Sequence, residues 1–130
     1  MAVLKLRGLA FSPVLNASGA RGFFGEGYWF HLVWRLLTFG LFNWLFTTFV
    51  AKTVTFFARS GNLPLKADGI TAREWFPSCI YTGRAAAGVL LNAVGLTNRG
   101  LVWSLAHSSW QKRKRPFFLS IMPMGETPEQ

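Results

Sequence analysis

Near the N-terminus, apolar and basic residues alternate in a way that is typical of a short strand with one buried face. Leu4–Leu9 shows this alternation, and Gly8 allows a turn near its end. A second apolar stretch, Phe11–Asn16, predicts another strand, which Pro13 restricts to a sheet edge or to the start of a strand. The pattern therefore predicts two consecutive short strands.

A strongly aromatic stretch, Tyr28–Phe49, allows more than one interpretation. Three leucines at helical spacing, followed by Gly40 as a helix C-cap, predict an amphipathic helix that packs on a sheet, and we prefer this interpretation. Leu36–Val50 lacks charge but is shorter than the about 20 residues that a spanning helix needs. Membrane contact through residues 28–50, either at the interface or as a span, remains the alternative.

Two later apolar runs predict buried strands. Phe49–Phe57 is rich in apolar and β-branched residues and is interrupted by Lys52. Pro116–Met122 has a similar composition, and Leu101–Trp110 has the spacing of a helix. The glycine-rich stretch Gly19–Gly27 predicts a flexible loop.

The block Lys66–Ala87 carries weak structural signals. Thr71 and Glu74 have the spacing of a helix capping box, but Pro77 limits any helix there to about one turn. The sequence suggests no function for this block.

The charge balance is strongly basic. The chain has 14 Lys and Arg against 5 Asp and Glu, a formal net charge of +9. Such a balance can attract nucleic acid or an anionic membrane. The cations are scattered except for Lys112–Arg115, whose position before an apolar strand favours a solvated loop over a nucleic-acid or lipid patch. Glu26 is expected to lie at the N-terminus of the predicted helix.

The remaining titratable residues restrict the chemistry. The single cysteine, Cys79, excludes an internal disulfide and a cysteine metal cluster. We expect His31 and His107 to be surface or packing residues, because neither has a neighbour that suggests a dyad or a metal pair. No apolar signal core follows the first basic residues, so a cytoplasmic location is expected.

Three segments share the chemistry of a site for a flat ligand. Small residues at 17–19 let a backbone approach a ring closely. Lys52 lies in an apolar run, which is costly unless the ammonium group meets an anion or another partner. Asn92, at the start of Asn92–Asn98, offers both a donor and an acceptor to a heterocycle. We therefore expect Lys52 and Asn92 to converge on one planar ring system.

The order and chemistry of these segments resemble the N-terminal part of the dihydroorotate dehydrogenase family. The resemblance implies an α/β fold, namely about three βα units and an N-terminal hairpin from a TIM (β/α)₈ barrel. It also implies FMN as cofactor and oxidation of dihydroorotate to orotate in pyrimidine biosynthesis. The matching stretches are Leu4–Leu6, Phe11–Gly19, Phe49–Thr55, Arg59–Asn62, Asn92–Asn98, Gly100 and Pro116–Met122.

The resemblance assigns roles around the flavin. Ala17, Ser18 and Gly19 would line the ring through backbone contacts, and Thr53 would add a hydroxyl group. Lys52 would be the catalytic residue, because its ammonium group would stabilise the negative charge that the ring acquires on reduction.

The resemblance also assigns a substrate site. Asn92 would bind the pyrimidine edge or the carboxylate of dihydroorotate, and Lys52 would contact the substrate as well. The backbone N–H groups of Val94, Gly95 and Leu96 would hold the carboxylate.

The chain departs from the family pattern at two positions, and its cysteine is not the family's base. The family often has Thr where Ala51 stands and Arg where Lys66 stands, and Cys79 does not match the motif of the catalytic base. The length of the Lys66–Ala87 block also leaves the substrate open. A barrel acting on another dihydropyrimidine is therefore an alternative.

The length predicts a truncated barrel, because a TIM barrel typically needs about 250 residues and the chain has 130. Residues 125–130 read as the start of a helix, with Thr127 as N-cap and Pro128 as first helical residue. In the family the catalytic base is a Cys or Ser on a loop after the fourth strand. The 130 residues match only the first three strands and lack this base, so the isolated chain is expected to be inactive. The full-length enzyme could form a homodimer. The remaining alternative is a small basic membrane-associated protein without catalysis.

Overall fold

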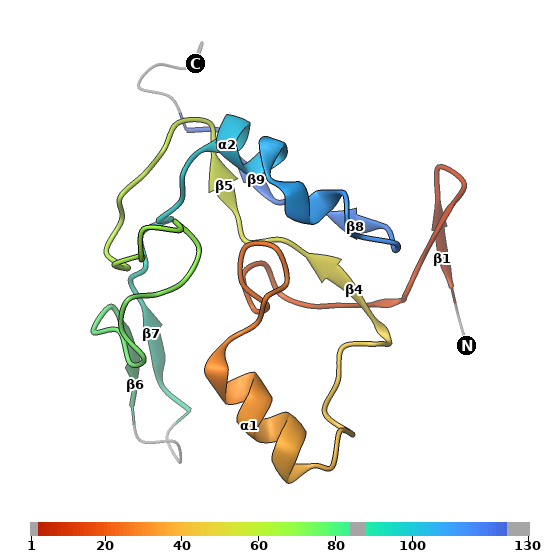
Figure 1. Ribbon diagram of the computed structural model, residues 1–130, viewed down its shortest axis with the longest axis horizontal. Coiled ribbons are helices and arrows are strands. Elements are labelled where there is room, and N and C mark those ends of the chain that lie inside the picture. Colours follow the sequence, from red (N-terminus) through yellow and green to blue (C-terminus); the bar gives the residue numbers. More distant parts are fainter. Residues whose placement is uncertain (1–2, 84–87, 125–130) are drawn as a thin grey trace. The chain divides into compact units, whose positions relative to one another are not determined.

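The computed structural model describes residues 3–83 and 88–124. The predicted helix start at Thr127 and Pro128, and the end of the Lys66–Ala87 block, lie outside them. Figure 1 shows the elements, which in chain order are β1 Leu4–Leu6, β2 Leu9–Phe11, β3 Val14–Leu15, α1 Trp29–Leu37, β4 Thr47–Val50, β5 Val54–Thr55, β6 Ile80–Thr82, β7 Leu90–Asn92, α2 Leu101–Ala106, the 3₁₀ helix η2 Ser108–Trp110, β8 Phe117–Phe118 and β9 Ile121–Met122.

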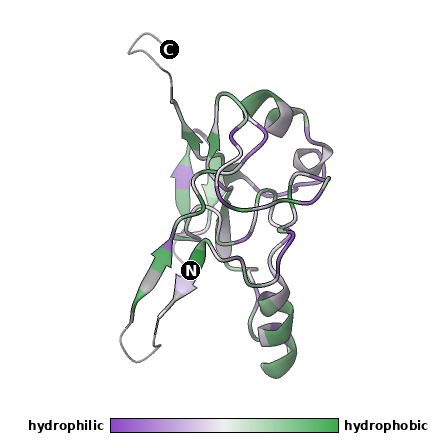
Figure 2. Cartoon of the chain, turned by 90° about the vertical axis from the view of Figure 1, so that its left-hand side faces the viewer, coloured by the Kyte–Doolittle hydropathy of each residue, from purple (hydrophilic) through white to green (hydrophobic). Residues whose placement is uncertain are grey.

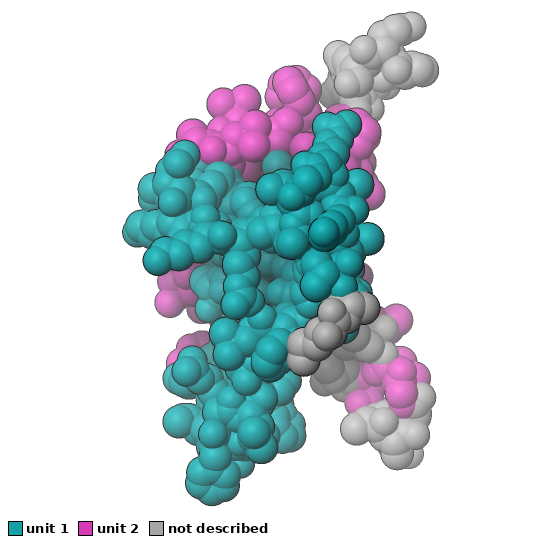
Figure 3. All heavy atoms as spheres, turned by 90° about the vertical axis from the view of Figure 1, so that its right-hand side faces the viewer, with its two compact units in different colours: residues 1–53, 107–120 teal, residues 54–106, 121–130 magenta. Residues whose placement is uncertain are grey.

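The chain divides into two compact units, which Figure 3 colours separately. Unit 1 comprises Met1–Thr53 and His107–Ser120, and unit 2 comprises Val54–Ala106 and Ile121–Gln130.

In unit 1, β1 and β2 form an antiparallel hairpin. Arg7 and Gly8 make its two-residue turn, and both have positive φ, +48° and +78°, as the tight hairpin turns require. The prediction of one strand over Leu4–Leu9 is therefore wrong, because the turn divides it. The prediction of one strand over Phe11–Asn16 is also wrong, since Ser12 and Pro13 separate the hairpin from β3.

A parallel sheet of order β3–β4–β8 forms the rest of the framework of unit 1. Val14 is paired with Thr47, and Phe49 is paired with Phe117. Parallel neighbours need a crossover, and α1 lies in the connection from β3 to β4. Buried aromatic side chains pack around this sheet, among them Phe11, whose ring stacks on Phe118 at 4.8 Å.

The predicted strand Phe49–Phe57 is divided between the units. The ladder of β4 extends one residue beyond the strand, because the N–H of Ala51 donates to the carbonyl of Phe118 at 2.9 Å. Lys52 and Thr53 then leave the ladder, and β5 pairs in parallel with β9 in unit 2. Likewise β8 and β9 replace the single predicted strand Pro116–Met122.

Helix α1 confirms the predicted helix, but not its predicted packing, because none of its residues is buried. It ends in a Schellman arrangement, in which Phe39 N–H donates to Leu36 and Gly40 N–H donates to Arg35. Phe39, rather than Gly40, therefore occupies the first left-handed position after the C-cap Thr38. Over residues 3–83 and 88–124, no helix has the length and hydropathy needed to traverse a bilayer.

Glu26 does not serve α1. Its two carboxylate oxygens accept hydrogen bonds from the N–H groups of Phe23 and Phe24, both at 2.8 Å. The predicted role at the helix N-terminus is therefore wrong, and Glu26 instead holds its own loop closed.

In unit 2, an antiparallel hairpin of β6 and β7 lies beside the turn-forming stretch after Asn92. Residues 66–79 form turns and bends with no helix, so the capping-box spacing of Thr71 and Glu74 does not lead to one. The predicted helix Leu101–Trp110 is interrupted at His107, whose extended backbone separates α2 from η2.

The predicted fold class is confirmed at a coarse level, because the chain is a mixed α/β structure with small sheets, one of them a parallel three-stranded sheet. Barrel closure is not shown by these strands.

Candidate functional site

The carboxyl ends of three parallel strands in unit 1 place the predicted flavin-binding residues together. Residues 16–19 follow β3, residues 51–53 follow β4, and residues 119–120 follow β8. Because β3, β4 and β8 are parallel neighbours, these three segments meet at one sheet edge. Ligands of parallel α/β sheets bind at this edge.

A chain of hydroxyl groups runs along this edge. Ser18 Oγ donates to the carbonyl of Ala51 at 2.8 Å. Ser18 Oγ and Thr53 Oγ1 are 2.8 Å apart, and Thr53 Oγ1 and Ser120 Oγ are also 2.8 Å apart. Since each hydroxyl has one proton, Thr53 must donate to Ser18 and Ser120 must donate to Thr53. The remaining lone pairs can accept N–H groups of a ligand.

Ser120 is a member of this hydroxyl chain to which sequence analysis assigns no role. The apolar pattern places it only inside the predicted strand Pro116–Met122. The sequence holds no signal for this role, because Ser120 comes to lie beside Thr53 only through the pairing of β8 with β4.

Lys52 lies against the small-residue turn. A Cβ placed on Gly19 would be 3.5 Å from Lys52 Cγ, and Gly19 has a φ of +80°, so the turn depends on glycine. The Lys52 ammonium group is 5.5 Å from the ring centroid of Phe23, within range of a cation–π contact.

Two further residues fix the turn in place. Tyr28 donates its hydroxyl proton to the carbonyl of Gly19 at 2.8 Å. Burial, together with the nearby Glu26 charge, raises the pKa of Tyr28, which keeps this donor protonated. Asn16 is buried and completes the ladder between β3 and β4 by donating to the Val50 carbonyl at 2.9 Å and accepting from Val50 N–H at 3.1 Å.

The predicted substrate-binding residues lie in unit 2. Asn92 ends β7, and its Oδ1 accepts the Val94 N–H at 3.1 Å. This hydrogen bond has to open before Asn92 Oδ1 and the Val94 N–H can both serve a substrate. Gly95 and Leu96 follow with positive φ, +69° and +58°.

Neighbouring residues hold this turn from two sides. Asn62 N–H donates to the Val94 carbonyl at 2.9 Å, and Arg59 Nε donates to the Gly95 carbonyl at 3.0 Å. A Cβ on Gly61 would lie 2.6 Å from the Val94 carbonyl oxygen, so Gly61 has to be glycine for this approach. These residues matched the family pattern but were given no role.

Asn98 anchors the other end of the same turn. Its side chain is 3% exposed, donates to Thr55 Oγ1 at 2.9 Å and to the Leu96 carbonyl at 2.6 Å, and accepts from Gly100 N–H at 2.7 Å. A buried amide with this many partners fixes the turn to β5.

The structure therefore brings together Ala17, Ser18, Gly19, Lys52 and Thr53 in unit 1, and, separately, Asn92, Val94, Gly95 and Leu96 in unit 2. Two cavities, one of about 800 Å³ in unit 1 and one of about 820 Å³ in unit 2, are lined by none of these residues.

The two histidines are packing residues, as predicted. His107 stacks on Phe24 with ring centroids 3.9 Å apart, and its Nδ1 accepts Ser109 N–H at 3.3 Å. The His31 ring contacts Trp44 edge-on at 5.3 Å. Within the described part of the chain, no group of three or more His, Cys, Asp or Glu residues could hold a metal ion.

Comparison of the chain with protein-family models, with curated proteins and with solved structures gave no match.

Proposed function

We propose that the chain is the N-terminal part of an FMN-dependent oxidoreductase of the dihydroorotate dehydrogenase type, which converts dihydroorotate to orotate. The observation that carries this proposal is the hydroxyl chain of Ser18, Thr53 and Ser120 beside Lys52, at the carboxyl ends of three parallel strands. The proposed fold is a TIM barrel, of which β3, β4 with β5, and β8 with β9 would be the first three strands.

The residues at this edge fit a flavin ring. Small residues at positions 17–19 allow backbone contact with a flat surface, while Ser18, Thr53 and Ser120 offer oxygen lone pairs to ring N–H groups. Lys52 adds a positive charge in the same place. When bound, FMN supplies an acceptor for two electrons.

In this proposal Lys52 stabilises negative charge that develops on the ring. An ammonium group placed in advance at such a position favours the charged state over the neutral state.

Asn92 and the turn Val94–Leu96 bind the polar edge and the carboxylate of the substrate. A substrate without a carboxylate, such as another dihydropyrimidine, remains the alternative, and comparing the binding of orotate with that of uracil separates the two.

The test is a riboflavin fluorescence titration of the chain, because riboflavin carries the ring without the phosphate. We expect saturable quenching, weakened about fivefold by Ser120→Ala, which removes one hydrogen-bonding group worth about 1 kcal/mol. Because reduced riboflavin scarcely fluoresces, its binding is measured by calorimetry without oxygen. Lys52→Met should weaken this binding about tenfold while changing that of the oxidised ring less, since the charge exists only after reduction.

Ser108→Ala and Lys5→Met are the matched controls, because both residues lie in unit 1, are exposed and are remote in sequence from the sheet edge. Both controls should bind riboflavin as the unmodified chain does. Absence of saturable quenching, or equal weakening in the controls, would contradict the proposal.

A second candidate function, attachment to a membrane surface, is favoured by α1. Every residue of this nine-residue helix is at least partly exposed, including Leu36 at 68% and Trp34 at 54%. Figure 2 shows that hydrophobic colouring covers most of α1. Exposed leucine with tryptophan is the composition of helices that lie in the membrane interface.

Liposome flotation tests this second function. Leu32→Gln combined with Leu36→Gln should abolish flotation, whereas Val102→Gln, at an exposed position of α2, should leave it unchanged. Flotation that persists in the double variant would contradict attachment through α1.

A further inference from the structure

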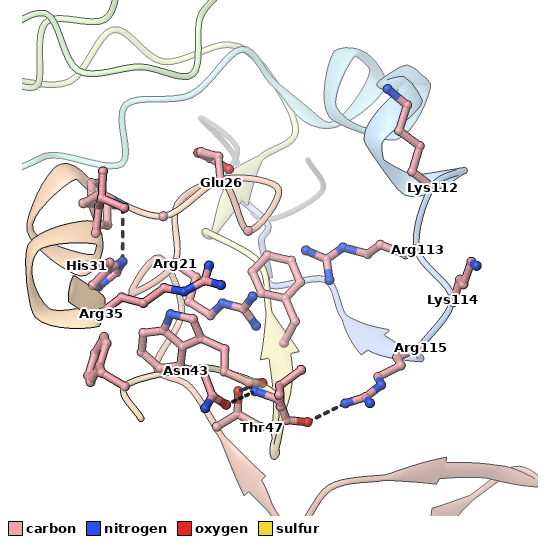
Figure 4. Close-up of a pocket in the computed structure, with 18 of the residues that line it drawn as sticks. Arg21, Glu26, His31, Arg35, Asn43, Thr47, Lys112, Arg113, Lys114 and Arg115 are labelled. Carbon is pink, nitrogen blue, oxygen red and sulfur yellow. Dashed lines mark hydrogen bonds between the residues drawn. The ribbon is translucent and has the colours of Figure 1, made fainter. Parts of the chain in front are cut away.

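A cavity of about 800 Å³ in unit 1 has a strongly cationic lining (Figure 4). It is bounded by α1, by the connection from α1 to β4, and by the segment before β8. The cationic residues come from three separate parts of the sequence and are Arg21, Arg35, Lys112, Arg113, Lys114 and Arg115.

The lining offers little negative charge in return. Glu26 is the one carboxylate among the described residues that line the cavity, and its oxygens already accept two backbone N–H groups. Arg115 donates to the Leu45 carbonyl at the rim. The cavity therefore has a large excess of positive charge.

Two of the guanidinium groups are partly withdrawn from water. Arg113 lies 3.8 Å from the ring centroid of Phe49, and Arg21 lies 5.3 Å from the same ring and 5.2 Å from that of Trp44. The Nε atoms of Arg21 and Arg113 are buried without a hydrogen-bond partner. Arg113 Nη2 donates to the Phe24 carbonyl, but the two Nε–H groups have lost hydration that the protein does not replace.

The two groups also repel each other. Burial lowers the pKa of both Arg21 and Arg113. The charge of Arg21 lowers the pKa of Arg113 further, and the charge of Glu26 partly offsets this by raising it. In Figure 4, Arg21, Arg35 and Arg113 point toward the same space, while Lys112 and Lys114 point away from it. An anion in this space would offset both the lost hydration and the repulsion.

We propose that this cavity binds a phosphate group, carried either by a small phosphorylated molecule or by a lipid headgroup. Guanidinium groups pair with phosphate through two parallel hydrogen bonds, and several of them are needed to neutralise a dianion. Arg21, Arg35 and Arg113 are the binding residues. The ring of Phe49 contacts Arg21 and Arg113, and that of Trp44 contacts Arg21. This inference is independent of the proposed flavin function, because it uses none of the residues at the sheet edge.

The experiment is calorimetric titration of the chain with inorganic phosphate and with pyrophosphate at constant ionic strength, with chloride as the reference anion. We expect saturable binding, tighter for pyrophosphate because it carries more charge. The NMR titration of His31, which lines the cavity, supplies a second signal. The pKa of His31 is lowered by burial and by Arg21, and a bound anion should raise it.

Variants locate the binding. Arg35→Gln changes an exposed residue, and Arg113→Gln changes a half-buried one. If the Arg113→Gln chain fails to fold, the Arg35→Gln chain still tests the proposal. Each should weaken pyrophosphate about tenfold, as expected for loss of a charged hydrogen bond. Lys5→Gln removes the same charge from the exposed strand β1 of unit 1 and should leave affinity unchanged. Equal weakening in all three, or binding no stronger than that of chloride, would overturn the proposal.

Vesicles separate the two sources of the phosphate group. If lipid is the source, phosphatidic acid vesicles should bind the chain, and pyrophosphate should displace them. If a soluble molecule is the source, pyrophosphate should bind and the vesicles should not compete. Vesicle binding that survives excess pyrophosphate and is weakened by Leu36→Gln takes place through α1, because Leu36 is exposed and does not line the cavity. If calorimetry also detects no binding of pyrophosphate, the proposed phosphate site is overturned.

Discussion

At the scale of single residues, Asp68 shows how local hydrogen bonds set a titration. Its carboxylate accepts the N–H groups of Ile70 and Thr71, both at 2.9 Å. The hydroxyl of Thr71, followed by these two N–H groups, lowers the pKa of Asp68 from 3.8 to about 2. The charged form is therefore favoured in the folded loop.

We predict that Asp68 titrates with a midpoint of about 2, measured by the NMR shift of its carboxyl carbon. Because the pKa is lowered on folding, the stabilisation is fully present above the ordinary pKa and is lost as the pH falls through the folded value. Thr71→Val removes the hydroxyl and keeps the N–H groups, so it should move the midpoint upward. A midpoint near 3.8 in the unmodified chain would contradict this reading of the loop.

Residue types were a good guide where local chemistry decides the structure. Sequence analysis assigns Lys52 and Thr53 to the flavin site, and both residues lie at the sheet edge. They lie there because β4 ends before them, although the apolar pattern of the sequence continues. Ser120 was missed because a serine after an apolar run carries no signal until β8 is paired with β4. Arg113 was expected to be solvated, but its contact with Phe49 depends on residues 64 positions earlier in the chain.

At the scale of elements, α1 ends in a left-handed backbone conformation at a residue whose side chain disfavours it. Phe39 has a φ of +50°, which costs about 1 kcal/mol or more for a residue with a Cβ. Its side chain is 97% exposed, so packing does not offset this cost.

We predict that Phe39→Gly raises the free energy of unfolding by about 0.5–1 kcal/mol, because glycine adopts this conformation without steric cost. Denaturant unfolding measures the change. Leu41→Gly is the control, since Leu41 is 85% exposed but does not have positive φ, and it should not be stabilising. A destabilised Phe39→Gly chain would show that the ring of Phe39 has a partner.

The extent of each strand was harder to predict than its existence. The apolar run Phe49–Phe57 predicted one strand, but the parallel pairing of β4 ends near Ala51 and that of β5 begins at Val54. Where a strand ends depends on the residues that pair with it, and these lie far away in the sequence. The hydrophobic periodicity of the strand itself does not reveal where they are. The hairpin of β6 and β7 was missed for the same reason.

At the scale of the whole molecule, the proposed flavin-binding residues lie in unit 1 and the proposed substrate-binding residues in unit 2. The order of β3, β4 and β8 in a parallel sheet is what consecutive βα units produce. The sequence indicated this class through its apolar runs and intervening helix. It also predicted a small-residue turn at Ala17–Gly19, where Gly19 has a φ of +80°. That this turn and Lys52 bind a flavin stays a prediction.

The most direct test of the flavin proposal is the map of amide shifts that riboflavin produces in the ¹⁵N-labelled chain. Saturable shifts should be concentrated at residues 17–19, 51–53 and 119–120, with none in the hairpin of β1 and β2. The absence of saturable shifts, or shifts confined to α1 and the cationic cavity, would contradict a flavin site at the edge of the parallel sheet.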